Sequence, residues 1–452
     1  MSALKRGNIE GYKQTEVGVI PEDWDIYPLD KLITSTQLGG NYANSETESN
    51  YPLIKMGNLG RGKIKLDKLE FVKGNVSVRD RLELNDVLFN TRNTLELVGK
   101  VAIWKNELPE AYFNSNLMRF VFDEKLVSSN SYMNAAMNTK TFVTGLAGIA
   151  TGTTSVAAIY TRDLLQLKLP IPPKREQTVI ANALSDVDAL LTELENLIAK
   201  KQAIKTATMQ QLLTGKTRLP QFATYTEGEK KGQPKGTKPS ELGEIPEDWG
   251  KVNIGDNAIL KARIGWQALT TKEYLYTGSK FLVTGTDFDA GNVNWDSCCF
   301  VSDWRYKQDA NIQLKTNDVL ITKDGTIGKV GFINDLPLPA TLNSGVFVIR
   351  PKLQSFHPKY LFYVLTSSVF KSFMKGITAG STITHLYQKD FVNFEFSSPG
   401  VEEQTAIAAI LSDMDCEIQT LEQRLAKNRQ IKQGMMQELL TGRTRLPFKK
   451  DS

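Results

Sequence analysis

The chain is poor in the residues that build disulfide frameworks and metal centres. Its 452 residues include three cysteines and two histidines. Cys298 and Cys299 are adjacent and Cys416 stands apart, so neither a disulfide framework nor a metal-ligand spacing is recognisable. We therefore predict no metal site, and we expect a reducing, cytoplasmic environment.

Long apolar runs are missing as well. No run of about 18 or more apolar residues occurs, so the sequence predicts no membrane span, and the N-terminal residues show no apolar signal core. Hydrophobic residues make up 41% of the chain, as in a globular protein. The formal net charge of +5 permits nucleic-acid binding without requiring it.

What the chain does contain is a long internal repeat. Residues 16–24 read EVGVIPEDW, and residues 241–249 read ELGEIPEDW. Residues 177–220 then match residues 404–447 at 24 of 44 positions without a gap. Self-similarity of this kind indicates two units of about half the chain each. Two like halves predict approximate two-fold symmetry and a target that presents two like features.

Each unit begins with a mixed region between the PEDW signature and a helix. Short β-rich runs alternate there with Gly, Asn and Asp turns. Asn-Asp-Val-Leu recurs at 85–88 and 317–320, and Gly-Lys-Val at 99–101 and 328–330. Elsewhere the two regions differ strongly. We predict two related α+β domains with variable loops on a common frame.

A long amphipathic helix follows each mixed region, because apolar residues recur there at alternating spacings of four and three. Pro173 and Pro399 precede the helices, and Gly215 and Gly442 follow them as predicted left-handed caps. Burial of each stripe residue is worth roughly 1.5–3 kcal/mol, so the stripe requires a partner. The simplest arrangement is a long antiparallel coiled coil between two domains related by a pseudo-two-fold axis; the alternative is an oligomerisation device. The stripe consists of Ile180, Leu184, Val187, Leu191, Leu194, Ile198, Ile407, Leu411, Met414, Ile418, Leu421 and Leu425.

These residues carry a resemblance to a known family. The run IPPKREQ at 171–177, followed by Ile180, Leu184 and a Leu-Leu-Thr-Gly helix end, resembles the conserved helical region of specificity (S) subunits of type I restriction-modification systems. The PEDW segments resemble the start of each target recognition domain. The second copy departs from the pattern, since Gly400 stands where the first copy has a proline. The resemblance covers essentially the whole chain.

The resemblance implies a non-catalytic subunit that binds double-stranded DNA. Each target recognition domain would read one half of a bipartite, asymmetric site. The helices would set the spacer and dock two modification (M) subunits, which carry S-adenosylmethionine; restriction (R) subunits would use ATP and Mg²⁺. No cofactor is expected in this chain. The implied division is target recognition domain 1 (1–170), central conserved helix (171–215), solvated linker (216–240), target recognition domain 2 (241–398), C-terminal conserved helix (399–443) and tail (444–452).

Polar, glycine-flanked loops at matching places in the two units are the candidate DNA contacts. Arg and Lys side chains bond guanine, Asn bonds adenine, and Ser and Thr bond phosphate; the alternative is that these loops are ordinary turns. The candidates are Lys55, Asn58, Arg92, Asn93, Thr151, Thr153 and Thr154 in the first unit, and Thr284, Thr286, Lys323, Thr326, Ser381, Thr382, Thr384 and His385 in the second.

Catalytic motifs are weak by comparison. Residues 214–217, TGKT, lack the glycine that a phosphate-binding loop requires, because Gln210 stands there. No Asn-Pro-Pro-aromatic methyltransferase motif occurs. We predict no catalytic residue. Two alternatives stay open: a fused restriction-modification enzyme, which methyl transfer by the chain alone would support, and a protein-binding scaffold, which salt-dependent DNA binding would argue against.

Overall fold

The chain forms two compact units. The structure is a computed structural model and describes residues 10–153, 155–240, 243–378 and 385–447. Unit 1 comprises Met1–Glu195 with Gln423–Ser452, and unit 2 comprises Asn196–Glu422. Each unit therefore contains one mixed region and a part of each long helix. The predicted α+β architecture, repeated in two units, is confirmed.

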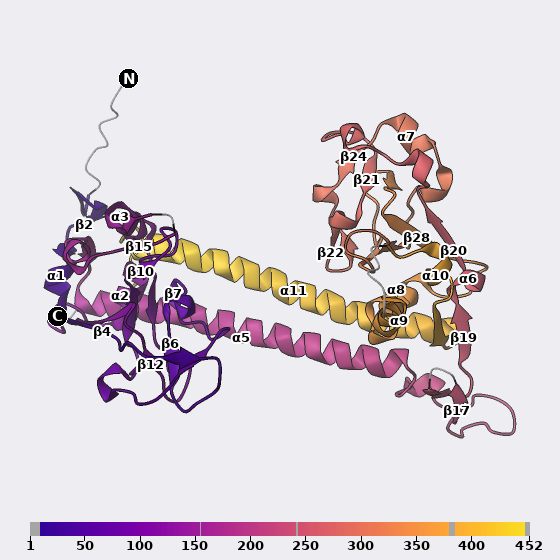
Figure 1. Ribbon diagram of the computed structural model, residues 1–452, viewed down its shortest axis with the longest axis horizontal. Coiled ribbons are helices and arrows are strands. Elements are labelled where there is room, and N and C mark those ends of the chain that lie inside the picture. Colours follow the sequence, from indigo (N-terminus) through magenta and orange to yellow (C-terminus); the bar gives the residue numbers. More distant parts are fainter. Residues whose placement is uncertain (1–9, 154, 241–242, 379–384, 448–452) are drawn as a thin grey trace. The chain divides into compact units, whose positions relative to one another are not determined.

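Unit 1 is built on a five-stranded sheet in the order β4-β13-β9-β11-β7 (Figure 1). A four-stranded sheet, β12-β6-β8-β5, and a three-stranded one, β10-β15-β14, accompany it. The strands are β4 (Ile33–Leu38), β5 (Asn44–Ser45), β6 (Pro52–Ile54), β7 (Gly62–Lys63), β8 (Glu70–Val72), β9 (Val87–Asn90), β10 (Arg92–Asn93), β11 (Val101–Ile103), β12 (Tyr112–Phe113), β13 (Leu117–Phe122), β14 (Thr151–Gly152) and β15 (Ala157–Ala158).

Unit 2 repeats this frame with different inserts. Its main sheet has the order β20-β28-β25-β26-β23-β22, and a second sheet has the order β24-β21-β27. As in unit 1, the second sheet contains one parallel pair, β21 with β27, which corresponds to β6 with β12. The strands are β20 (Ala258–Ala262), β21 (Phe281–Val283), β22 (Phe288–Asp289), β23 (Asn292–Val293), β24 (Cys299–Phe300), β25 (Val319–Thr322), β26 (Val330–Phe332), β27 (Ala340–Leu342) and β28 (Val346–Pro351).

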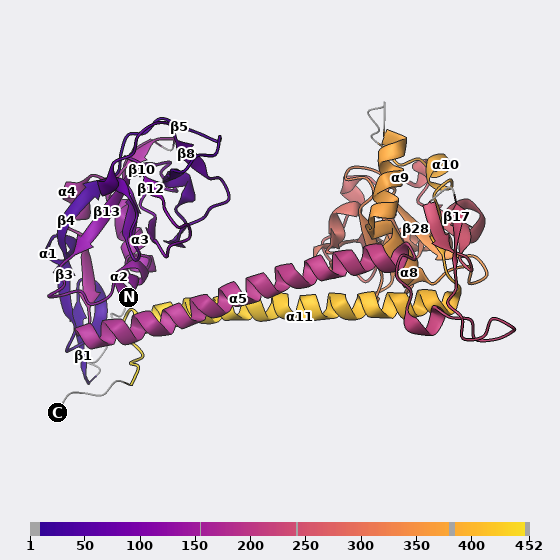
Figure 2. The same ribbon diagram turned by 90° about the horizontal axis from the view of Figure 1, so that it is seen from below.

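Two-stranded pairs and short helices complete each unit. In Figure 2, β5 and β8 lie at one end of unit 1, and β1 lies at the other end beside the start of α5. The pairs are β1 (Tyr12–Thr15) with β2 (Gly18–Pro21), β3 (Asp25–Pro28) with β16 (Lys168–Ile171), β17 (Thr237–Ser240) with β18 (Gly243–Pro246), and β19 (Gly250–Asn253) with β29 (Glu395–Ser398). The shorter helices are α1 (Leu29–Leu32), α2 (Asn130–Ala136), α3 (Lys140–Ile149), α4 (Thr161–Leu164), α6 (Ile254–Asn257), α7 (Asp303–Lys307), α8 (Pro358–Thr366), α9 (Ser368–Thr378) and α10 (Gln388–Phe391).

The two long helices are α5 (Lys174–Leu213) and α11 (Val401–Leu439). Of the stripe predicted for them, Val187, Leu191, Met414 and Leu421 are half-buried and the other eight side chains are buried. Forty residues give α5 a length of about 60 Å. Within the described residues, no helix is long and apolar enough to cross a membrane.

Ion pairs show which helix segments lie together within each unit, and in which direction. In unit 1, Asp188 pairs with Lys432 (2.5 Å) and Glu195 with Arg429 (2.6 Å). In unit 2, Lys201 pairs with Glu417 (2.6 Å), and a further pair joins Lys205 to Asp415. Position numbers rise along one helix as they fall along the other, so the paired segments are antiparallel in both units.

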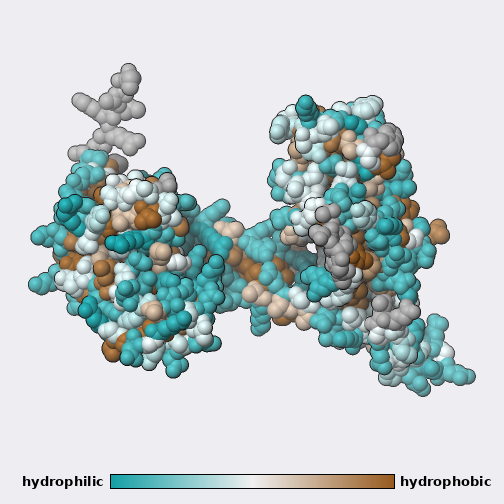
Figure 3. Space-filling model, viewed as in Figure 1, coloured by the Kyte–Doolittle hydropathy of each residue, from teal (hydrophilic) through white to brown (hydrophobic). Residues whose placement is uncertain are grey.

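Each unit has its main core where its sheet meets the helix ends. The core of unit 1 combines Phe89 of β9 and Phe120 of β13 with Ile180 of α5 and Leu439 of α11. The core of unit 2 combines Phe347 of β28 with the end of α5 and the start of α11. The face of each unit seen in Figure 3 is mainly hydrophilic, with scattered apolar residues, as expected of a globular surface.

The segment expected to be a solvated linker, residues 216–240, has more structure than its composition suggests. It contains the 3₁₀ helix η3 (Pro220–Phe222) and strand β17. The backbone N–H of Gly232 donates to the carbonyl of Tyr225 (2.9 Å), and the hydroxyl of Tyr225 bonds the carboxylate of Glu247. The abundance of Lys, Gly and Pro predicts a solvated linker, but a polar composition does not prevent a segment from pairing with a neighbouring strand.

Candidate nucleic-acid interface

The repeated motifs of unit 1 meet in one cluster, the unit 1 clamp, which consists of Asp23, Trp24, Glu176 and Arg445. Arg445 follows α11 and binds both carboxylates with its guanidinium. Its NH1 and NH2 atoms lie 2.9 Å from the two carboxylate oxygens of Asp23, and its Nε lies 2.5 Å from Oε1 of Glu176. Trp24 Nε1 donates to the buried Glu176 (3.0 Å). The hydrogen bond with Asp23, together with Glu176 and against the effect of burial, raises the pKa of Arg445.

Unit 2 has the same arrangement, the unit 2 clamp, which consists of Asp248, Trp249, Glu403 and Arg218. Arg218 follows α5, and its Nε and NH2 atoms lie 2.7 and 2.6 Å from the two carboxylate oxygens of Glu403. Its NH1 donates to Asp248 (2.8 Å), and the guanidinium lies 5.9 Å from the centre of a Trp249 ring. Bidentate Arg–carboxylate pairs are the strongest and most directional of such bonds. In each unit they join the PEDW signature to the start of one long helix and the end of the other.

Glycine caps fit closely against both clamps. Gly215 and Gly442 both have φ of +69°, as the sequence predicted for left-handed helix caps. A Cβ at Gly215 would lie 2.5 Å from Cδ of Pro246, and one at Gly442 would lie 2.4 Å from Cγ of Pro21. These contacts explain why glycine recurs at this position after both helices. The TGKT segment is therefore a helix cap and not a phosphate-binding loop.

With the frame held in this way, three polar segments of unit 1 meet at one edge. The backbone N–H of Asn114 donates to the carbonyl of Ile54 (3.1 Å), immediately before Lys55. The N–H of Thr91 donates to the carbonyl of Asn116 (3.0 Å). Strand β10 (Arg92–Asn93) then pairs with β15, which also pairs with β14, so that Arg92 and Thr151 both lie opposite Ala158. Residues predicted separately at 55, 91–93 and 151 are thus brought to one place.

Unit 2 uses corresponding hydrogen bonds to gather its own loops. The N–H of Asn343 donates to the carbonyl of Val283 (2.9 Å), immediately before Thr284. The N–H of Lys323 donates to the carbonyl of Gly345 (2.9 Å), and the N–H of Leu386 donates to the carbonyl of Lys323 (2.7 Å). These bonds bring Thr284, Lys323 and His385 together. The loops therefore occupy equivalent places on the two frames.

The candidate side chains differ in how open they are. Arg92, Thr151 and Thr153 are exposed. Asn58 is 4% exposed, and its side-chain amide donates to two carbonyls of its own loop, so it shapes the loop and is not open to DNA. Lys55 is paired with Glu70 at 2.9 Å.

Further candidates serve within their own loops. Thr284 and Thr286 bond each other through their hydroxyls (2.7 Å), and Asn93 accepts a bond from the N–H of Thr94 (2.8 Å). The backbone carbonyl of Thr326 accepts a hydrogen bond from the hydroxyl of Thr322. The candidates Thr154, Ser381, Thr382 and Thr384 lie outside the described residues.

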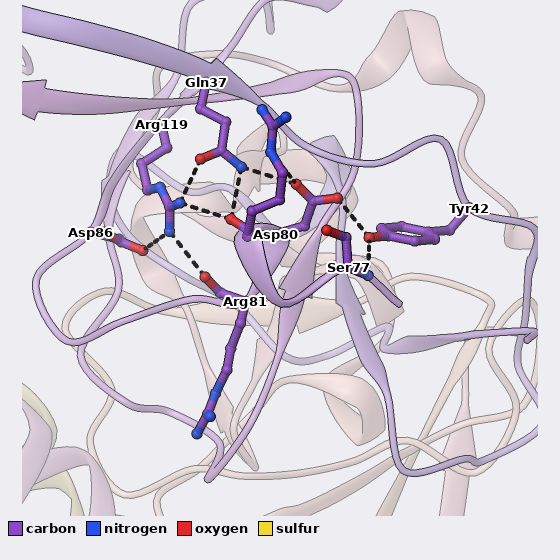
Figure 4. Close-up of polar contacts among 8 residues, drawn as sticks. Gln37, Tyr42, Ser77, Asp80, Arg81, Asp86 and Arg119 are labelled. Carbon is purple, nitrogen blue, oxygen red and sulfur yellow. Dashed lines mark hydrogen bonds and ion pairs between the residues drawn. The ribbon is translucent and has the colours of Figure 1, made fainter. Parts of the chain in front are cut away.

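Figure 4 shows a polar network of unit 1 that joins Arg119 to Tyr42 through Gln37 and Asp80. The Arg119 guanidinium donates to Asp86 (2.8 Å) and to Gln37 (2.6 Å). Gln37 in turn donates to Asp80 (2.9 Å), which also accepts the hydroxyl of Tyr42 (2.6 Å). Burial, followed by this hydrogen bond to Asp80, raises the pKa of Tyr42. The network holds Gln37 and Tyr42, and between them Gly40 donates to the carbonyl of Phe113 (3.1 Å) and accepts from the N–H of Ser115 (2.9 Å), at the turn of the interface.

A basic cluster of unit 1 was not identified from the sequence. Lys100 lies beside the end of β9, because the backbone N–H of Asn90 donates to the carbonyl of Lys100 (2.9 Å). Burial, and then the like charges of Lys65 and Arg61, lower the pKa of Lys100. Arg61 and Lys65 are exposed. The carboxylate of Glu96 also acts on Lys100 and opposes the two cations. Three cations outnumber this one carboxylate, which favours an anion at this place. These residues are scattered in sequence, so only the fold brings them together.

Other expected side chains have structural roles. His357, one of two histidines, is half-buried, and its backbone N–H donates to Gln404 (2.7 Å). Arg218 and Arg445 were not predicted as functional, although TRLP follows both helix caps and its recurrence was a usable signal. Among the described residues, no group of three His, Cys, Asp or Glu side chains is placed to hold a metal ion.

Comparison with known proteins agrees with this geometry. The chain matches the family model described as type I restriction modification DNA specificity domain, over residues 21–206 and again over 246–433. Two Methanocaldococcus jannaschii proteins are similar along nearly their whole length. One is assigned as the specificity subunit of the type I restriction enzyme MjaX, 26% identical over 442 residues and 97% of each chain. The other is the MjaVIII specificity subunit, 24% identical over 449 residues, 97% of this chain and 96% of the relative.

Solved structures show the same fold at lower sequence identity. The S subunit of a type I system from M. genitalium aligns with a TM-score of 0.58 and 16% identity, covering 92% of this chain and 96% of that one. A chain from a study of complex assembly and conformational transition in a type I system aligns with a TM-score of 0.52 and 16% identity, covering 94% and 99%.

Proposed function

Because the chain belongs to the family of type I restriction-modification DNA specificity subunits, we propose that each unit reads one half of a bipartite, asymmetric DNA site. As a specificity subunit, the chain is a non-catalytic component of its restriction-modification complex. The finer assignment, one half-site to one unit, is supported by the two interfaces described above.

This proposal rests on one observation: the two units share a backbone frame, but the side chains on their interface loops differ. Corresponding backbone hydrogen bonds hold the loops in both units, yet the side chains on the loops differ. Equal frames present a similar surface to two similar grooves. Unequal side chains select different base edges, since sequence is read by hydrogen bonds in the grooves while phosphate contacts only position the protein. Two different half-sites follow.

The helices would set the distance between the half-sites and receive the partners. In unit 1 the start of α5 lies beside the end of α11, and in unit 2 the start of α11 lies beside the end of α5. A clamp joins the two helices in each unit. Two copies of one partner subunit therefore find two like surfaces. We propose that two M subunits bind there with S-adenosylmethionine and that R subunits add ATP- and Mg²⁺-dependent functions. Adding a heptad to both α5 and α11 should lengthen the unspecified spacer while both half-sites stay the same.

Exchange of one recognition region tests the proposal directly. Residues 25–170 would be replaced by the matching region of another specificity subunit, and methylated adenines would be mapped across a genome that expresses the M subunit. We expect one half-site to change and the other to persist. The reverse exchange of residues 250–398 is the matched control and should change only the other half-site. Loss or change of both half-sites in each exchange would contradict the assignment.

The basic cluster provides an independent test by salt dependence. Lys65→Ala and Lys100→Ala should weaken binding to every DNA sequence about equally, because phosphates carry no base identity. Each lost phosphate contact should reduce the slope of log K against log salt by about one unit. Binding would be measured on the M-loaded complex across a salt series. Lys31→Ala, an exposed cation of α1, is the control and should leave the slope unchanged.

A further inference from the structure

The residues after Thr91 in unit 1 and after Lys323 in unit 2 occupy equivalent places. Thr91 accepts a backbone hydrogen bond from Ile159 (3.0 Å), and Lys323 accepts one from Leu386 (2.7 Å). The strands that lead to them, β9 and β25, have the same length and corresponding neighbours: β9 lies between β13 and β11, and β25 lies between β28 and β26. The next residue is Arg92 in unit 1 and Asp324 in unit 2. A cation and an anion therefore stand at one position of a shared frame.

Arg92 is free to act as a donor. It is exposed, and its guanidinium makes no hydrogen bond or ion pair with another described residue. Its cross-strand partner is Ala158, whose methyl group offers no competing acceptor. Paired residues of adjacent strands place their side chains on one face. The five N–H donors of Arg92 are thus available for a ligand on that face.

Asp324 is held as an acceptor. Its cross-strand partner is His385, whose Nδ1 lies 2.5 Å from Oδ1 of the carboxylate. Nζ of Lys323 lies 3.8 Å from Oδ2. The cation of Lys323 partly offsets the negative charge, which reduces its repulsion of DNA phosphates, and the hydrogen bond with the His385 ring fixes the orientation of the carboxylate. The Asp324 side chain is still 35% exposed, and a carboxylate has about four lone-pair sites, so acceptor capacity remains.

We propose that Arg92 and Asp324 give the two half-sites opposite hydrogen-bond polarity at one equivalent base position. Arg92 selects guanine, which presents the acceptors O6 and N7 in the major groove, and Asp324 selects cytosine, which presents the N4 amino donor. Adenine also presents an amino group, but its adjacent N7 acceptor repels a carboxylate. This inference rests on the proposed function and adds to it which residue of each unit determines base identity.

The test measures base preference at every position of both half-sites. The complex of the full chain with its M subunits would methylate a DNA library with randomised half-sites, and sequencing would count the methylated products. Arg92→Lys keeps the charge but loses the planar fork, and should lower the preference for guanine about 10- to 100-fold at one position of the unit 1 half-site. Asp324→Asn should move the preference at one position of the unit 2 half-site from cytosine to adenine, because an asparagine amide pairs with N6 and N7.

Control substitutions away from the interface separate base reading from general binding. The controls are Lys31→Ala and Asp256→Asn. Lys31 precedes β4 and Asp256 precedes β20, in each case at the end of the strand away from the interface. Both should keep every base preference. All four substitutions are at exposed or half-exposed side chains, so the variants are expected to fold, and thermal melting would verify it.

The outcomes distinguish this inference from the proposed function. A wild-type complex with no bipartite preference would refute the proposed function itself. A bipartite preference that Arg92→Lys and Asp324→Asn both leave unaltered would overturn the polarity assignment while the proposed function stands. A change by either variant in the other unit's half-site would overturn it as well. A general loss of methylation with unaltered base ratios would show a phosphate or folding role, which also contradicts the inference.

Discussion

Arg218 of the unit 2 clamp is the side chain whose loss should affect the frame most. Its side chain is 11% exposed, and that of Glu403 is 5% exposed. Arg218→Ala would leave Glu403 buried without its cation, and breaking a buried pair from one side destabilises by about 3–5 kcal/mol. Asp248 is 34% exposed, so solvent screening reduces its share, and we assign the loss mainly to Glu403.

The expected loss is large enough to measure on the full chain. At about 2–4 °C per kcal/mol for a unit of this size, the unfolding midpoint should fall by about 6–20 °C. Calorimetry measures the midpoint, and hydrogen exchange should show faster exchange near Asp248 and at the start of α11. Lys216→Ala removes an exposed cation two residues away, and its effect should stay within about 0.5 kcal/mol.

A double variant identifies the cause. Arg218→Ala with Glu403→Gln leaves no unpaired buried charge, so it should recover a large part of the stability lost by the single variant. The reasoning is refuted if Arg218→Ala melts within about 1 °C of Lys216→Ala. It is refuted equally if the second substitution simply adds to the first loss.

Three further predictions concern local features. Gly442→Ala should destabilise by about 2 kcal/mol or more in a thermal melt, because φ is +69° and Pro21 is close, whereas Gly434→Ala, inside α11 with open space around it, should stabilise by up to about 1 kcal/mol. Burial alone would raise the pKa of Asp248, but hydrogen bonds from Arg218 and Lys235 bring it below its usual value. The stability from Asp248 is therefore complete above its unfolded pKa of about 4 and is lost as pH falls through the folded pKa, so Asp248→Asn should flatten the acid limb of a pH–melting curve. Tyr363→Phe removes the hydrogen bond to Asp415 (2.8 Å) and should cost about 1 kcal/mol, with no change in half-site recognition.

Local physics determined much of the fold in advance. Alternating spacings of four and three fixed both long helices, because a helix places such residues on one stripe. Pro173 and Gly215 marked the limits within a few residues, since proline suits a helix start and glycine adopts the left-handed cap without strain. The runs at 86–89 and 318–321 were predicted as β-rich and became β9 and β25.

The candidate interface was predictable only in pieces. Loops at Lys55, Arg92 and Thr151 were selected because they are polar and flanked by glycine, but their sequence separation gives no sign that they meet. Asn58 shows the limit of that reasoning, because its amide is used inside its own loop. The basic cluster around Lys100 has no local signature at all.

The sequence by itself determined that this protein consists of two like units with long amphipathic helices, because repeats and periodicity are local properties of a chain. Only the tertiary structure decided that Arg218 and Arg445 close the frames and that Arg92 and Asp324 occupy equivalent places. The clamp contacts join residues up to about 420 positions apart. The clamps and the equivalent places both depend on long-range strand pairing and burial, which no short segment encodes.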